Sequence, residues 1–337
     1  MRLVPFFLCL TLPATAMAQS ASDIMQQAVE GHILPRYTAL AETGTALAQT
    51  AEKNCAPDDA ALRKAYNSAF DAWISASHLR FGPSEKGDRA FALAFWPDTR
   101  GLTPRSLRGL IEDADPVVNS AADYADVSIA ARGYYALEFM LYDPEITEQG
   151  TAEYRCALVQ AMAADIAAVT GAILADWQDH YADAMLNPGE NSPYRTAEEA
   201  VQELFKALTY GLQFTAETRM GRPLGTFDAP HPARAETWRA GRSLRNVVLS
   251  LESLADLAAI LAQRDPAVAD SLQDAFQVAL EDAEGLEDPV FAGVSDPLAR
   301  LRVESLQSAI TRVRDIVQTD LGPELGVAAG FNAMDGD

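Results

Sequence analysis

The stretch LRNVVLSLESLADLAAILAQ, Leu244 to Gln263, indicates most clearly how this chain folds. Its apolar residues recur at spacings of three and four, the period of one face of an α-helix. AADIAAVTGAILADW, residues 163–177, repeats the pattern, and strand-like alternation is nearly absent elsewhere. The sequence therefore predicts an all-α protein built of antiparallel helical bundles.

Helical patterns cover most of the chain, and capping residues support several of the starts. Thr196 with Glu199 three residues later forms a capping box. One long stretch, residues 81–127, lacks the pattern, and such a loop inside a helical protein is either functional or partly helical. The expected helices lie at about 21–52, 58–79, 128–142, 151–186, 196–220, 233–263, 267–284 and 297–320.

A short internal similarity suggests two related halves. HLRFGP (78–83) and ETRMGRP (217–223) each end a long predicted helix, and each contains Arg-x-Gly shortly before Pro. Gly followed by Pro is also an ordinary helix stop. Together with the number of helices, the similarity predicts two bundle halves, 19–190 and 191–337, that form one domain.

The first residues predict export. Arg2 precedes the apolar run LVPFFLCL, and Ala16-Met17-Ala18 is a small-x-small cleavage site. We expect residues 1–18 to be a signal peptide, cleaved after Ala18, which places the mature chain in the periplasm. The run is too short to span a bilayer, and we expect no transmembrane segment in the mature chain.

The charge of the chain limits its partners. It contains 48 Asp and Glu against 26 Lys and Arg, a formal net charge of −22. Such acidity argues against nucleic acids and anionic membrane surfaces, and it is compatible with cationic partners, including metal ions.

Two cysteines, Cys55 and Cys156, remain after removal of the signal peptide. In an oxidising compartment a pair of this kind is expected to form one disulfide. Two buried thiols are the alternative. A bridge would be a structural crosslink without a chemical role.

One helical stretch carries polar groups among apolar and aromatic ones. In RGYYALEFMLYD, residues 132–143, the side chains of Arg132, Tyr135, Glu138 and Tyr142 share a stripe of the predicted helix. A buried carboxylate needs hydrogen-bond partners, and the stripe could supply them as a structural network. The other interpretation is a site lined by Glu138, and both stay open.

Standard catalytic signatures are missing, so no catalytic residue is predicted. The chain has no His-Glu-x-x-His, Cys-x-x-Cys, nucleophile elbow or phosphate loop, and its four histidines lie far apart. Loops on a rigid scaffold often carry sites. Weaker candidates for lining a site are Arg132, Trp96, Asp98, Arg219, Asn332 and Asp335.

Several motifs resemble the imelysin family over nearly the whole mature chain. LGVAAGFNAMDGD (325–337) is similar to the family's C-terminal ending, and GYYALEF (133–139) resembles its Gly-x-His-x-x-Glu helix. Gly133 and Glu138 match that motif, while Tyr135 stands where the family has His. RFGP (80–83) and ETWRAGRSLRN (236–246) are also similar.

The resemblance implies an exported all-α protein with the motif helix near the junction of its halves. The family was described through an insulin-cleaving metallopeptidase, and many members are linked to iron acquisition as periplasmic metal-binding components. By resemblance, Tyr135 and Glu138 are the expected metal ligands. A phenol is a poor ligand unless it ionises, as it can with ferric iron.

We therefore expect a non-enzymatic accessory in metal handling. Its expected ligand is an iron ion, another divalent or trivalent metal ion, or a small ligand, and another periplasmic or outer-membrane protein is a further expected partner. A zinc-type metallopeptidase and a protein-interaction module without a metal site are the alternatives.

Overall fold

The computed structural model describes residues 14–327, and within that range the chain is helical with no β-strand. The all-α prediction is confirmed. The long helices are α1 (Ala14–Gln27), α2 (Leu34–Lys53), α3 (Ala60–Ala76), α7 (Gly133–Tyr142), α9 (Ala152–Asp176), α11 (Ala197–Gln213), α13 (Ser243–Leu261), α14 (Pro266–Glu284) and α15 (Pro297–Ile316).

Four of these helices continue past a π-helical turn into a neighbouring helix. The turns are η1 (Ala28–Ile33) between α1 and α2, η6 (Trp177–Tyr181) before α10 (Ala182–Leu186), η7 (Phe214–Met220) before α12 (Gly221–Leu224), and η10 (Val317–Leu321) before α16 (Gly322–Glu324). A π turn shifts the side chains that follow it around the helix, and such turns are frequent at functional sites.

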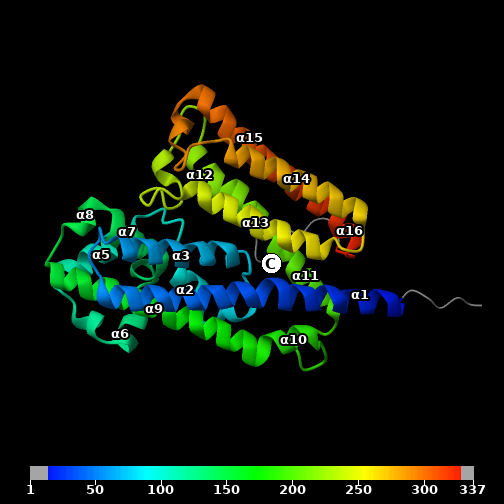
Figure 1. Ribbon diagram of the computed structural model, residues 1–337, viewed down its shortest axis with the longest axis horizontal. Helices are drawn as coiled ribbons and strands as arrows, with labels where there is room; N and C mark the ends of the chain where they lie inside the picture. The colour runs from blue at the N-terminus through cyan, green and yellow to red at the C-terminus, as the bar shows by residue number, and fades with distance from the viewer. Residues whose placement is uncertain (1–13, 328–337) are drawn as a thin grey trace, which may run out of the picture.

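The helices form two groups that meet along α3 and α13 (Figure 1). In the first group α2 packs against α3 and α9, and α7 packs against α9. In the second group α13 packs against α11 and α14, and α14 against α15. The continuous helix α1–η1–α2 spans both groups, because α1 contacts α11 while α2 contacts α9.

Most of the stretch 244–263 lies in α13, which packs against α11 and α14 in the second group. On α13 the large apolar side chains that are buried follow the spacing of three and four: Val247, Leu251, Leu254, Leu257 and Leu261. Each fully buried side chain of this size stabilises the fold by roughly 1.5–3 kcal/mol relative to exposure. Glu252, between two of them in sequence, is exposed.

Two helices begin later than the sequence pattern predicts. The expected helix at 128–142 starts at Gly133, because Arg132 is extended (φ −119°, ψ 165°). The expected helix at 233–263 starts at Ser243, because Thr237 (φ 44°) and Gly241 (φ 71°) adopt left-handed conformations in a turn. Both corrections concern the segments that carry the site described below.

The long stretch 81–127 is partly helical. It contains α4 (Arg89–Leu93), α5 (Leu102–Asp113) and α6 (Ala121–Ala125), and α8 (Pro144–Thr147) follows α7. The segment between α4 and α5 is irregular and includes a cis peptide bond between Trp96 and Pro97.

One helix has the length and composition of a membrane span. The continuous helix Ala152–Leu186 is long and apolar enough to cross a membrane by length and composition alone. In this structure it is a core helix: Leu158, Met162, Ile166 and Ile173 are buried, and α9 packs against α2 and α7. A core helix passes the same test, so the finding is weak evidence of a membrane span.

The predicted disulfide is confirmed. Cys55 follows the end of α2 and is bonded to Cys156 on α9, 101 residues later. The bridge therefore ties together the two helices that form the centre of the first group.

Replacing both cysteines by serine is expected to lower the free energy of unfolding by roughly 2–5 kcal/mol, since a long loop is released in the unfolded chain. Urea unfolding of the oxidised protein and of the C55S/C156S variant measures the difference. Reductant should shift the midpoint of the wild-type protein and leave the variant unchanged. A wild-type midpoint insensitive to complete reduction would contradict the stabilising role.

Candidate functional site

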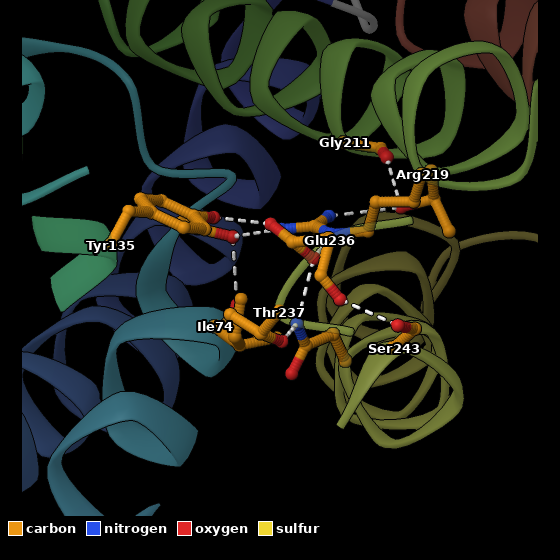
Figure 2. A network of polar contacts seen from close by, with 10 residues as sticks. Ile74, Tyr135, Gly211, Arg219, Glu236, Thr237 and Ser243 are labelled. Carbon is orange, nitrogen blue, oxygen red and sulfur yellow. Dashed lines mark hydrogen bonds and ion pairs between the residues drawn. The ribbon is translucent and has the colours of Figure 1, made fainter. Parts of the chain in front are cut away.

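A buried hydrogen bond joins the two helix groups at their junction. The hydroxyl of Tyr135, on α7, donates to the Glu236 carboxylate in the turn before α13 (Figure 2). The two side chains are 6% and 1% exposed. Tyr135 therefore points into the junction and not into solvent, and its partner is 101 residues away in sequence.

The other carboxylate oxygen of Glu236 is held by two donors. Arg219 Nε donates to Oε2 at 2.8 Å, and Asn246 Nδ2 donates to the same oxygen at 2.9 Å. Ser243 Oγ also donates to the Glu236 main-chain carbonyl at 2.6 Å. A buried carboxylate is tolerated when it is paired and fully hydrogen-bonded, which is the case here.

The π turn η7 presents Arg219 to this carboxylate. Arg219 Nη1 donates to Thr215 Oγ1 and Nη2 donates to Ser77 Oγ, both at 3.3 Å. Ser77 follows α3 of the first group, so the guanidinium also bridges the two groups. Figure 2 shows Arg219 reaching down from its helix toward Glu236, with Tyr135 on the opposite side.

The turn that carries Glu236 is strained. Thr237 has φ 44°, which is unusual for a β-branched residue. Asn246 Nδ2 donates to Thr237 Oγ1 at 2.9 Å as well as to Glu236, so one side chain of α13 fixes both residues. Such outliers persist only where the surroundings fix them, and they cluster at binding and active sites.

Gly133 allows the segment that carries Trp96 to pack against Tyr135. Gly133 has φ +72°, and a Cβ there would lie 2.2 Å from the main-chain oxygen of Leu93. Only glycine permits this approach of α7 to the end of α4. The segment that follows Leu93 then brings Trp96 onto Tyr135, with ring centroids 6.0 Å apart and an interplanar angle of 19°.

Trp96 and Tyr135 line two cavities. The larger has a volume of about 580 Å³. Its lining is aromatic and basic, with acidic groups among them: Trp73, Phe81, Phe91, Tyr210 and Phe214, and also Arg80, Lys206, Arg219, Glu85, Glu203 and Glu236. The smaller has a volume of about 200 Å³ and includes Glu138 and Asp98.

Glu138 is buried in the wall of the smaller cavity. It is 2% exposed, and its Oε1 accepts one hydrogen bond, from the Ala240 main-chain N–H at 3.0 Å. Burial raises the pKa of Glu138 to about 7, although the hydrogen bond from Ala240 and the charge of Arg239 oppose the shift. Burial, and then the charge of Glu236, raise the pKa of Tyr135 well above 10.

Five of the eight candidate residues line the larger or the smaller cavity. Tyr135 and Trp96 line both, Arg219 lines the larger, and Glu138 lines the smaller. Asp98 also lines the smaller cavity, but its carboxylate accepts hydrogen bonds from the Arg100, Leu102 and Thr103 main-chain N–H groups and caps α5. Asn332 and Asp335 lie outside the described residues.

Arg132 is not part of the site, which corrects the expected stripe. It precedes α7 in extended conformation, so the helical spacing that aligned it with Tyr135 does not apply. Its guanidinium binds Asp165 on α9 through two hydrogen bonds of 2.7 and 2.9 Å. Tyr142 also turns elsewhere, packing under the guanidinium of Arg63.

Sequence reasoning missed Glu236 and Asn246. Both lie in ETWRAGRSLRN, the segment that resembles the family, where the sequence predicted a helix and the structure has a turn.

The sequence also did not predict a buried histidine pair, in which Nε2 of His32 lies 2.8 Å from Nε2 of His78. Burial lowers both pKa values, that of His78 to about 3, so both rings are neutral near pH 7.

The site fits a hard metal ion only in part. Within residues 14–327 no group of three or more His, Cys, Asp or Glu side chains could hold a metal ion. The phenol of Tyr135 and the carboxylate of Glu236 are oxygen donors of the kind that suits ferric iron. A metal bound there would need further ligands from outside this set.

Comparison with known proteins identifies the class. The Imelysin family model (Peptidase_M75) matches residues 33–317, and the chain therefore belongs to the imelysin family. Iron-regulated protein A of Synechococcus elongatus is 24% identical over 92% of this chain and 89% of that protein.

Two solved structures share the fold. An imelysin-like protein from Psychrobacter arcticum has a TM-score of 0.76 at 22% identity and covers 93% of this chain and 98% of its own. A protein described as an iron-regulated protein A precursor, from Parabacteroides distasonis, has a TM-score of 0.74 at 14% identity, with 89% and 94% covered.

Removing Arg219, the positively charged partner of Glu236, should destabilise the folded protein. R219M leaves a buried carboxylate without its counter-charge, and we expect the free energy of unfolding to fall by about 3–5 kcal/mol. R219M/E236Q should recover part of that loss. In the more exposed pair of Arg108 and Glu145, 2.7 Å apart, R108M should lower the free energy of unfolding by at most about 1 kcal/mol. Equal losses in R219M and R108M, measured by urea unfolding, would refute the assignment.

Glu138 should make stability depend on pH. Its pKa is about 7 in the folded protein against an ordinary value of 4.5, so the folded state binds the proton more tightly. The stability contributed by the protonated group is therefore lost as pH rises from about 4.5 through about 7. E138Q mimics the protonated form. Over this pH range its free energy of unfolding should therefore rise relative to that of the wild type, by at most about 3 kcal/mol.

Urea unfolding of both proteins at pH 5 and pH 8 measures this gain. E252Q, on the exposed face of α13, is the control for loss of a carboxylate. A stability difference between E138Q and the wild type that is the same at both pH values would contradict the burial of an ionisable Glu138.

Proposed function

We propose that this protein is an exported, non-catalytic component of iron handling that binds ferric iron, or a small complex of it, beside Tyr135. Membership of the imelysin family and the similarity to a protein named for regulation by iron support an iron-related role. The observation that carries the proposal is the hydrogen bond between Tyr135 and Glu236 at the wall of the larger cavity.

The chemistry of these two groups favours a trivalent ion. Burial and Glu236 hold the pKa of Tyr135 well above 10, so the phenol stays protonated without a strong positive charge nearby. A ferric ion supplies such a charge and binds phenolate and carboxylate oxygens well. Without a bound cation, Arg219 provides the counter-charge for Glu236.

The surroundings favour iron that arrives with ligands of its own. The described residues do not supply three His, Cys, Asp or Glu donors at one point. The larger cavity of about 580 Å³ offers room beside Tyr135, with aromatic rings on its walls. A small chelator could complete the coordination of the ion and pack against those rings.

Export is part of the proposal. The predicted signal peptide, residues 1–18, supports it at the level of sequence. The Cys55–Cys156 bridge supports it independently, because such crosslinks persist mainly in oxidising compartments such as the periplasm.

The metallopeptidase alternative has less support. A catalytic zinc site usually has three protein ligands, a bound water and a general base. The position of the motif histidine is Tyr135, whose hydroxyl is bonded to Glu236. Glu138 lies in the smaller cavity and accepts a hydrogen bond from a main-chain N–H.

Ferric iron, added as a weak chelate, should produce a phenolate-to-iron charge-transfer band in the visible spectrum. Y135F should lack the band while keeping the helical circular dichroism, because the ring volume is nearly unchanged. Y210F is the matched control, since Tyr210 lines the same cavity, and it should keep the band.

Three results would overturn this proposal. They are no iron binding by the wild type, a band that survives in Y135F, and metal-dependent cleavage of an unfolded protein substrate that E138Q abolishes. The last result would support the peptidase instead.

A further inference from the structure

Two arginines line the smaller cavity without a carboxylate partner. Arg222 lies on α12, directly after the π turn that presents Arg219, and Arg234 ends the short helix η8 (Pro232–Arg234). Among the described residues neither guanidinium forms an ion pair. This is unexpected beside a cavity in a chain whose formal net charge is −22.

The other charged groups of the cavity are already engaged. Asp98 accepts three main-chain hydrogen bonds, and Arg239 pairs with Asp143 at 2.6 Å. Glu138 is buried and accepts from the Ala240 N–H. Neither carboxylate of the cavity lining, Asp98 or Glu138, forms an ion pair with Arg222 or Arg234.

Arg222 is placed to receive a ligand. Its Nε is buried and has no hydrogen-bond partner in the structure. A buried donor of this kind costs free energy unless something accepts from it. The Arg222 guanidinium lies 5.7 Å from the centre of the Trp96 ring, and Trp96 lines both cavities.

The two guanidinium groups also repel each other. Burial lowers the pKa of Arg222, and the charge of Arg234 lowers it further. An anion between them would replace this repulsion with two charge-assisted hydrogen-bonding contacts. A planar guanidinium matches the oxygens of a carboxylate or a phosphate and can bind either in a bidentate manner.

We propose that the smaller cavity is an oxyanion site in which Arg222 and Arg234 bind a small carboxylate- or phosphate-bearing ligand. The volume of about 200 Å³ suits a compact anion and excludes a macromolecule. Trp238, 37% exposed, and Phe139 add aromatic groups to the lining of the cavity. The site is separate from Glu236 and does not depend on iron binding.

Titration calorimetry in a buffer free of oxyanions, at low ionic strength, tests the site with citrate and with inorganic phosphate in separate experiments. Binding of either by the wild-type protein is expected, and the stronger of the two identifies the preferred chemistry. R234Q removes an exposed guanidinium at the cavity and should weaken binding about tenfold or more. R222Q should do the same.

R312Q is the control, because Arg312 is exposed on α15 and its loss changes the net charge equally. It should bind the anion as the wild type does. Failure of both anions to bind, or equal weakening in R312Q and R234Q, would overturn the proposal. Because R234Q alters an exposed side chain, it remains informative even if R222Q does not fold. If the anion binds to the wild type but the charge-transfer band with iron survives in Y135F, the iron proposal is refuted and the oxyanion site stands.

Discussion

The buried carboxylate of Glu236 is the group on which the junction of this protein depends. It comes from a strained turn and is held by Tyr135 of one helix group and by Arg219 and Asn246 of the other. An unpaired carboxylate at this depth would cost several kcal/mol. The π turn before α12, the left-handed Thr237 and the close approach at Gly133 each position one of its neighbours.

The fold could be predicted from the sequence because its determinants are local. The spacing of Val247, Leu251 and Leu254 fixes both the helix and its buried face. Most long helices begin and end within a few residues of the pattern, since capping residues such as Thr196 mark their starts. The disulfide could be predicted from the number of cysteines, because the predicted mature chain contains only two.

The site was harder to predict, for a physical reason. Tyr135 and Glu236 are 101 residues apart, and periodicity carries no information about which distant helix supplies a partner. The wrong start of the helix at 233 hid the turn, because left-handed conformations at Thr237 and Gly241 leave little trace in an apolar pattern. Arg132 was misplaced for the same reason, since helical spacing was assumed one residue before the helix begins. Resemblance to the family located both segments of the site, but not the contact between them.

The stacked pair of Trp96 and Tyr135 lines both cavities. Any occupant of one cavity that displaces these two rings alters the shape of the other cavity. Thermodynamic linkage then requires the effect to be mutual: the factor by which the first occupant changes the affinity for the second equals the factor in the reverse direction. Two cavities that share an aromatic wall can therefore be coupled without any rearrangement of the helices.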